Sequence, residues 1–140
     1  MRVLALDVGD RTLGVAVSDP FGWTAQSLGT LRRTRDERDF EAVLELVRRY
    51  GAERVVVGLP RNMDGTEGPR ALRTRRFAEA LRRRLPVPVE EWDERLTTVQ
   101  AERALLDADV SRARRRRVID GMAAALILQS YLERRRAGGG

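Results

Sequence analysis

Three groups of acidic residues occupy positions from which their carboxylates could act together. Asp7 lies near the end of an apolar run typical of a buried strand, where an unpaired carboxylate is costly. Asp93 and Glu94 directly follow the last predicted strand, and Asp120 lies on the small, apolar face of the last predicted helix. Because parallel strands end at one edge of a sheet, where ligand sites gather, these acids could converge there.

Each acid also has a simpler explanation when it is taken alone. Asp7 could belong to a turn, and the Asp93–Glu94 pair could belong to a solvated loop. Asp120 could interact with the dipole of a helix N-terminus, which is worth roughly 0.3–1 kcal/mol. Only the combination of the three groups favours a shared site.

The chemistry open to such a site is narrowed by the composition. The sequence has no histidine and no cysteine, and all 27 of its basic residues are arginine. This excludes Ser-His-Asp and Cys-His nucleophiles, zinc held by histidine or cysteine, and lysine Schiff bases. Converging carboxylates repel one another, and Mg²⁺ or Mn²⁺ relieves that repulsion with oxygen ligands alone. Two such ions can activate water and stabilise the leaving oxygen in phosphodiester hydrolysis, so the trio favours a metal-dependent nuclease.

The charge balance indicates a polyanionic partner. With 27 basic and 21 acidic residues the net charge is +6, and the sequence pI is about 11.1. A bias that replaced lysine by arginine explains the choice of basic residue but not the excess of positive charge. RNA or DNA is the partner we expect. The candidate nucleic-acid-binding residues are Arg11, Arg61, Asn62, Thr66, Arg95, Arg112, Arg114, Arg115, Arg116 and Arg117.

The hydrophobic pattern predicts one α/β domain over residues 1–136, followed by a flexible tail over 137–140. An antiparallel hairpin and third strand lead into strand-helix-strand crossovers, which gives a five-stranded mixed sheet with helices on both faces. The predicted strands cover 2–8, 13–17, 24–31, 54–60 and 87–92, and the predicted helices cover 36–50, 69–85, 97–106 and 118–136. We expect a polar, basic segment just before the last helix.

Four segments together carry a family resemblance that spans residues 2 to about 132. They are LALDVGDRTLGVAVSD, VVVGLPRNMDGTEG, WDERLTT and IDGMAAALILQSYL, and in this order they resemble the YqgF/RuvX family of bacterial RNase H-like proteins. The resemblance implies an RNase H-like fold, with Asp7, Glu94 and Asp120 as catalytic acids and metal ligands. Asp93 could assist or replace Glu94. Gly58-Leu59-Pro60 stands where a RuvC-like resolvase would carry an acid, which implies that one metal ligand has moved to the DERLTT segment.

The resemblance further implies a nuclease that processes the 5′ end of precursor 16S ribosomal RNA. One alternative is a Holliday-junction or DNA-repair nuclease, which would act as a homodimer because junction resolution uses two-fold symmetry. Another is a non-catalytic RNA-binding factor in ribosome assembly. DVGDRTLGVAVSD also resembles the phosphate hairpin of actin-like ATPases, which need a second related domain. No signal peptide or membrane-spanning run stands out, so we expect a cytoplasmic protein without a membrane partner.

Overall fold

The computed structural model describes residues 1–97 and 112–138, and within 112–121 it describes the backbone alone. The strands are β1 (Val3–Val8), β2 (Thr12–Ser18), β3 (Ala25–Arg32), β4 (Arg54–Leu59) and β5 (Val89–Asp93). The helices are α1 (Asp36–Tyr50), α2 (Pro69–Arg84) and α4 (Arg112–Ala137), and a short 3-10 turn, η1 (Glu94–Leu96), follows β5.

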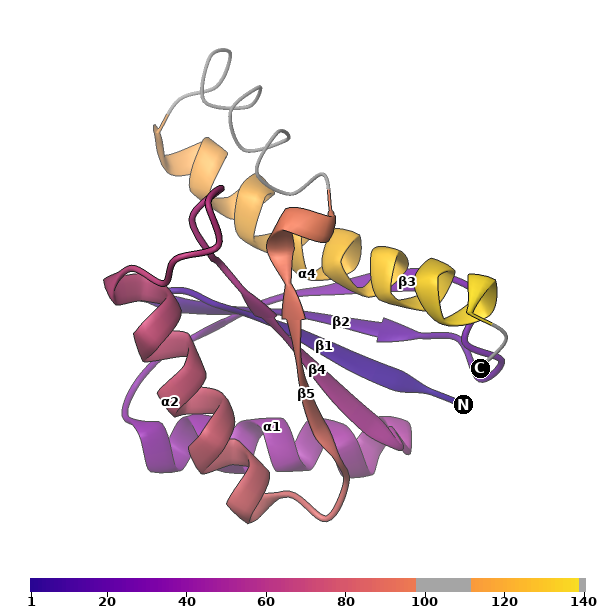
Figure 1. Cartoon of the computed structure of the whole chain (residues 1–140). Helices are drawn as coiled ribbons and strands as arrows, with labels where there is room; N and C mark the ends of the chain where they lie inside the picture. The colour runs from indigo at the N-terminus through magenta and orange to yellow at the C-terminus, as the bar shows by residue number, and fades with distance from the viewer. Residues whose placement is uncertain (98–111, 139–140) are drawn as a thin grey trace.

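The five strands form one sheet in the order β3-β2-β1-β4-β5 (Figure 1). β1 pairs in parallel with β4, and β4 pairs in parallel with β5, while β2 and β3 are antiparallel. This confirms the predicted mixed sheet. The carboxyl ends of β1, β4 and β5 therefore lie at one edge, which is the edge where the acidic residues were expected.

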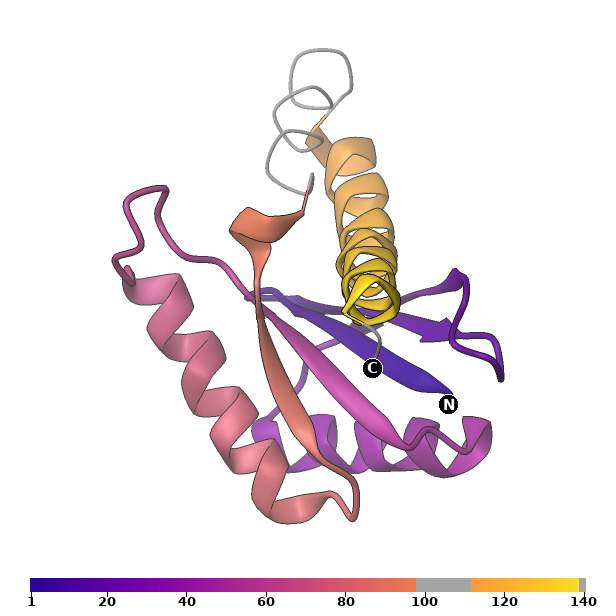
Figure 2. The ribbon, with the colours of Figure 1, turned by 45° about the vertical axis from the view of Figure 1, so that its right-hand side comes forward.

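Helices cover both faces of the sheet. α1 and α2 lie on one face and α4 crosses the other (Figure 2). Along β1 the side chains alternate, so that Leu4 and Leu6 join the core under α1 and α2, while Val3 and Ala5 join the core under α4. Asp7 continues the second set and therefore lies on the α4 face.

Small residues bring α4 close to the sheet. Ala123 and Ala124 are buried against it together with Ile127 and Leu128. Alanine has no atoms beyond Cβ, so the helix backbone can approach the strands where these residues pack. Tyr131 extends the same face and meets Trp92 of β5 edge to face, with ring centroids 5.6 Å apart.

Two element boundaries differ from the prediction in ways that concern the acids. α4 begins at Arg112, so Arg112 and Arg114–Arg117 lie within the helix and not in a segment before it. Arginine is a good helix former, and no glycine or proline interrupts this run. β5 begins at Val89, directly after Pro88, and includes Asp93 as its last residue. Proline has no N–H for the sheet ladder, which explains the later start.

The predicted helix over 97–106 and the predicted tail over 137–140 fall on segments that the structure describes only in part. The predicted helix over 97–106 lies outside the described residues except for Thr97. α4 extends to Ala137, one residue into the predicted tail, and 139–140 lie outside the described residues. In the part of the chain that the structure describes, no helix is long and apolar enough to cross a membrane.

Candidate active site

Asp7 and Glu94 are buried at the carboxyl edge of the sheet, on the face that α4 covers. Asp7 is 2% exposed and Glu94 is 0% exposed. Along β5, Glu90 and Trp92 lie on the side that faces α4, whereas Val89 and Glu91 lie on the other side. Glu94 continues the side that faces α4. The structure thus brings together two of the three acids that the sequence singled out. We call Asp7, Glu94 and Gly58, which lies between them, the carboxylate site.

Gly58 leaves the space that the Glu94 side chain occupies. A Cβ atom placed on Gly58 would lie 3.0 Å from Oε1 and 3.3 Å from Cγ of Glu94, and 2.5 Å from Cδ1 of Ile127. Asp7 and Gly58 each follow the paired residues Leu6 and Val57, so they are neighbours on β1 and β4. The Glu94 carboxylate therefore lies over β4, about one strand spacing of 4.8 Å from β1.

Arg70 reaches the same site from the first turn of α2. Its Nη2 atom lies 3.5 Å from Oδ1 of Asp7. The guanidinium side chain is 43% exposed, whereas the Asp7 side chain is 2% exposed. Arg70 was not among the predicted site residues, although Pro69 predicted a helix start that follows a strand ending at the same edge.

Asp93 lies on the opposite side of β5 from Glu94. Its carboxylate accepts hydrogen bonds from Arg95 Nε at 3.0 Å and Nη2 at 2.7 Å, and Arg61 Nη1 lies 3.8 Å away. It also caps η1 by accepting from the Arg95 backbone N–H at 2.9 Å. The hydrogen bonds from Arg95 lower the pKa of Asp93 below its usual range. Asp93 thus fixes the turn that carries Glu94.

The loop over residues 60–68 connects β4 to α2 beside this turn. Asn62 Nδ2 donates to Thr66 Oγ1 at 2.9 Å, and Thr66 Oγ1 donates to Asp64 Oδ1 at 2.6 Å. Arg95 Nη1 donates to the Met63 carbonyl at 3.3 Å. The side chains of Asn62, Thr66 and Arg95, all predicted to bind nucleic acid, therefore also hold this loop together.

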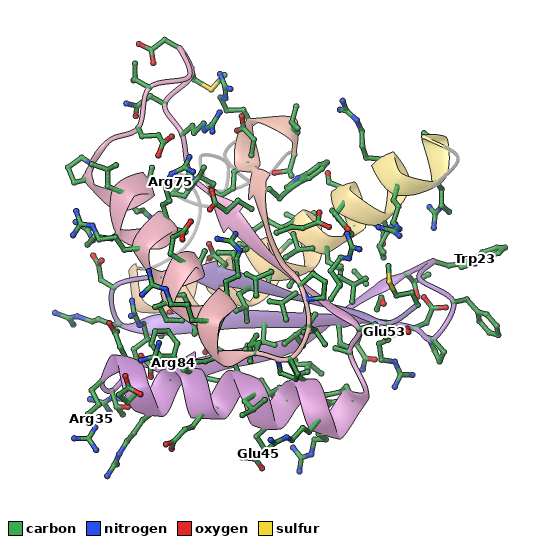
Figure 3. All side chains as sticks on the ribbon, turned by 60° about the horizontal axis from the view of Figure 1, so that its bottom comes forward. Trp23, Arg35, Glu45, Glu53, Arg75 and Arg84 are labelled. Atoms are coloured by element: carbon green, nitrogen blue, oxygen red, sulfur yellow. The ribbon has the colours of Figure 1, made fainter. Side chains whose placement is uncertain are left out.

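An ion-pair network ties the base of that loop to α2 and β5. Arg75 of α2 (labelled in Figure 3) forms two hydrogen bonds with Glu67, of 2.9 and 2.6 Å, and its Nη1 lies 2.9 Å from Glu91 of β5. Arg61 Nη2 lies 3.7 Å from Glu67. The hydrogen bonds from Arg75 lower the pKa of Glu67, which keeps the network charged. Arg61, another predicted nucleic-acid-binding residue, is part of this network.

Asp120 belongs to α4, and its side chain lies outside the described side chains. It precedes Ala123, Ala124 and Ile127 by three, four and seven positions, and these three residues pack on the sheet. The helix begins eight residues before Asp120, so the alternative of a charge near the helix N-terminus is wrong. Among the described residues, no group of three acidic side chains that could hold a metal ion is present.

The strand order and the helices on both faces define an RNase H-like fold. In fold the chain is similar to RuvC of Thermus thermophilus, solved in complex with a Holliday junction substrate, with a TM-score of 0.61, 19% identity, and coverage of 99% of this chain and 96% of that one. It is also similar in fold to the fowlpox virus Holliday junction resolvase, with a TM-score of 0.53, 15% identity, and coverage of 95% of this chain and 99% of that one.

The chain belongs to the RuvX family, whose model, described as Holliday junction resolvase, matches residues 1–134. Relatives named "Putative pre-16S rRNA nuclease" occur in Moorella thermoacetica, with 59% identity over 96% of this chain and 96% of the relative, and in Heliobacterium modesticaldum, with 55% identity over 95% of this chain and 89% of the relative. The family resemblance inferred from the four sequence segments is confirmed, and it makes the chain a nuclease by class.

Proposed function

We propose that the chain is a metal-dependent nuclease that hydrolyses phosphodiester bonds of precursor 16S ribosomal RNA near its 5′ end. The observation that carries the proposal is the burial of Asp7 and Glu94 at the carboxyl edge of the sheet, where the Glu94 carboxylate lies over Gly58, the neighbour of Asp7. Two carboxylates in such a place raise the free energy of the folded chain unless a cation or a proton compensates their charge.

The donor set fits a hard divalent cation. Both described acids offer oxygen ligands, as Mg²⁺ and Mn²⁺ prefer, and the sequence has no histidine or cysteine that would favour a softer metal. Asp7 and Glu94 would hold the metal, with Asp120 as the third ligand. When bound, such a metal supplies Lewis-acid activation of water and charge stabilisation at the phosphate.

Other residues of the chain would orient these ligands. Gly58 leaves room for the Glu94 carboxylate above β4. Asp93 and Arg95 hold η1 so that Glu94 faces α4, which makes Asp93 a positioning residue in this proposal and not a ligand. Arg70 adds a positive charge beside Asp7, where it also faces an incoming phosphate group.

The choice of substrate is supported by the names of the relatives and by the charge of the chain. Relatives that share more than half of its sequence are named for precursor 16S rRNA. The net charge of +6 suits a polyanion. Bacterial precursor rRNA is found in the cytoplasm, so the proposal also implies a cytoplasmic protein.

A cleavage panel with matched variants tests the proposal. The substrates are a linear RNA that spans the 5′ processing site, its DNA counterpart and a four-way DNA junction, each with Mg²⁺ or Mn²⁺. We expect the wild type to cleave the RNA, and Asp7→Asn and Glu94→Gln to lose at least about a hundredfold in rate. Glu45→Gln, which removes an exposed charge on α1, should cleave like the wild type. Cleavage by Asp7→Asn at the wild-type rate would contradict the proposal.

Thermal melting gives a readout that does not depend on turnover. Mn²⁺ should raise the Tm of the wild type, because a ligand that binds only the folded state stabilises it. The rise should shrink or vanish in Asp7→Asn, Glu94→Gln and Asp120→Asn. A wild type that binds RNA, shows no Mn²⁺ shift and cleaves nothing would favour the non-catalytic ribosome-assembly factor.

Junction resolution is a second candidate function, favoured by the description of the family model. A resolvase must cut two strands related by two-fold symmetry, so it should be a homodimer in solution. If sedimentation showed a dimer and the protein cleaved the four-way junction in preference to RNA, junction resolution would replace the RNA assignment. A monomer that cuts only linear RNA would exclude this candidate.

A further inference from the structure

A cationic pocket lies beside the carboxylate site, where the β1–β2 turn, the end of β3 and α2 meet. It encloses about 520 Å³. The residues that line it are Asp10, Arg11, Arg32, Arg33, Thr34 and Arg73. Four of these residues are arginines, and we call it the arginine pocket.

One arginine forms the rigid wall of this pocket. Arg33 Nη1 donates to the Gly9 carbonyl at 2.8 Å, while its Nε lies 3.2 Å from Asp39 and its Nη2 lies 3.2 Å from Asp36. Asp39 is buried, and it also accepts from the Thr34 backbone N–H at 3.1 Å. Arg33 therefore joins the β1–β2 turn to the start of α1, and its charge is balanced by two acids.

Of the other three arginines in the pocket, Arg73 is balanced by an acid, whereas Arg11 and Arg32 are not. Arg73 pairs with Asp10 at 3.3 Å, which matches those two charges. The side chains of Arg11 and Arg32 are exposed and take part in none of the ion pairs found among the described residues. The pocket thus presents two uncompensated guanidinium groups, one from the β1–β2 turn and one from the end of β3. Arginine forks match the geometry of phosphate oxygens.

The pocket is close to the carboxylate site along both β1 and α2. Gly9, which Arg33 contacts, is two residues beyond Asp7, a separation of at most about 7 Å. On α2, Arg70 reaches Asp7, and Arg73, one turn later, reaches Asp10. The pocket and the carboxylate site are therefore adjacent on both elements, so one nucleic-acid strand could contact both.

We infer that the arginine pocket binds a phosphate group of the nucleic-acid strand, one to a few nucleotides away from the bond that is cleaved. The inference rests on the proposed function, because it takes the carboxylate site as the place of cleavage. Arg11 and Arg32 supply the charge, and Arg33 fixes the β1–β2 turn that holds Arg11. The pocket sets the position of the strand and carries no base specificity.

The test measures binding without cleavage. A short fluorescent single-stranded RNA is titrated with the protein in Ca²⁺ at several salt concentrations, and the double variant Arg11→Gln/Arg32→Gln is compared with the wild type. Arg48→Gln/Arg49→Gln is the matched control, because it removes the same charge from the exposed C-terminal end of α1. A second RNA series replaces one phosphate at a time by an uncharged methylphosphonate.

We expect the pocket variant to bind about tenfold more weakly, with a salt slope smaller by about 0.7 for each phosphate that the protein no longer neutralises. The control should bind within about twofold of the wild type. One methylphosphonate position should weaken the wild type and leave the pocket variant unaffected. If that position is internal, the pocket holds a backbone phosphodiester. If only removal of a 5′-terminal phosphate has this effect, the pocket holds the strand end.

The inference is overturned if the pocket variant keeps the affinity and salt slope of the wild type, or if no phosphate position distinguishes the two proteins. This failure is separable from failure of the proposed function. A pocket variant with normal binding and normal cleavage contradicts the pocket alone. A wild type that binds through the pocket but never cleaves contradicts the nuclease and leaves the pocket in place.

Discussion

At the carboxylate site the placement of Glu94 depends on a side chain that is missing from the neighbouring strand. The Glu94 carboxylate and the end of Ile127 both occupy the space over Gly58. A larger residue at position 58 would clash with both side chains, and the two clashes have different consequences. Contact with Ile127 is a matter of packing, whereas contact with Glu94 moves a proposed metal ligand.

Gly58→Ala should therefore lose both stability and activity. The new Cβ would lie 2.5 Å from Ile127 Cδ1 and 3.0 Å from Glu94 Oε1. Overpacking of this kind costs about 1–3 kcal/mol, and we expect cleavage to fall at least about tenfold. Urea unfolding and cleavage rates measure the two effects.

Adding Ile127→Val separates the two effects because valine lacks Cδ1. The double variant should regain most of the lost stability but remain slow, since the contact with Glu94 persists. Ile127→Val alone should cleave normally and cost about 0.5–1.5 kcal/mol. If the double variant regained full activity, Gly58 would not position Glu94.

Asp7 and Glu94 could be singled out from the sequence only in combination with Asp120, and the family resemblance favoured Glu94 over Asp93. Arg70 and the arginine pocket could not be singled out. Arginine is so frequent in this chain that no single one is conspicuous, and the partners of Arg70 and Arg73 are 63 residues away in the sequence. Only the packing of α2 beside the β1–β2 turn brings them together.

At the scale of elements, η1 and the loop over 60–68 are held by charges and not by apolar contacts. Asp93 and Glu67 accept hydrogen bonds from Arg95 and Arg75, and Arg61 lies near both acids. The large apolar side chains of Met63 and Leu96 are exposed here. The ion-pair network, and not an apolar core, thus stabilises these segments.

Asp93→Asn should lower stability in a pH-dependent way. The hydrogen bonds from Arg95 hold the pKa of Asp93 below its ordinary value of 3.8. A lowered pKa gives stability that is fully present above about pH 3.8 and is lost as pH falls through the pKa of the folded state. We expect a cost of about 1 kcal/mol at pH 7 that disappears under strongly acidic conditions. Urea unfolding as a function of pH measures it.

Arg95→Gln provides the partner for a double-mutant cycle. If Asp93 and Arg95 act as a pair, the double variant should be little less stable than either single variant. Asparagine still offers an oxygen to the Arg95 backbone N–H, so the cap of η1 is kept. An equal cost of Asp93→Asn at pH 7 and at pH 2 would contradict this origin of the stability.

Helix boundaries were predictable where local chemistry fixes them. α1 was predicted at its observed bounds because Phe40, Val43 and Val47 repeat at helical spacing and Gly51 ends the helix with a φ of 62°. The start of α4 was placed too late because its first turns are arginine-rich and lack an apolar face. Charge runs of this kind fit a helix and a solvated loop equally well in sequence.

The whole molecule is organised around a central sheet that two cores share. α1 and α2 pack on one face and α4 packs on the other (Figure 2). Alternate residues of β1 contribute to each core, so neither core can form without that strand. This architecture follows from the strand pattern in the sequence, whereas the contacts of α4 with β2 and β3 depend on tertiary packing.

Because the cores share β1 and β4, we expect the chain to unfold as one cooperative unit. Trp23 is 64% exposed and points away from the body of the molecule (Figure 3), so Trp23→Phe leaves Trp92 as a fluorescence probe of the α4 face. In this background Leu81→Ala empties a fully buried position of α2 on the other face, at a cost of about 2–5 kcal/mol. Trp92 fluorescence and far-UV circular dichroism should then shift to lower urea together.

Leu72→Ala, at an exposed position of the same helix, should shift both by less than about 0.5 kcal/mol. A Trp92 transition that stays at the wild-type midpoint while circular dichroism falls would mean that the α4 core is stable alone.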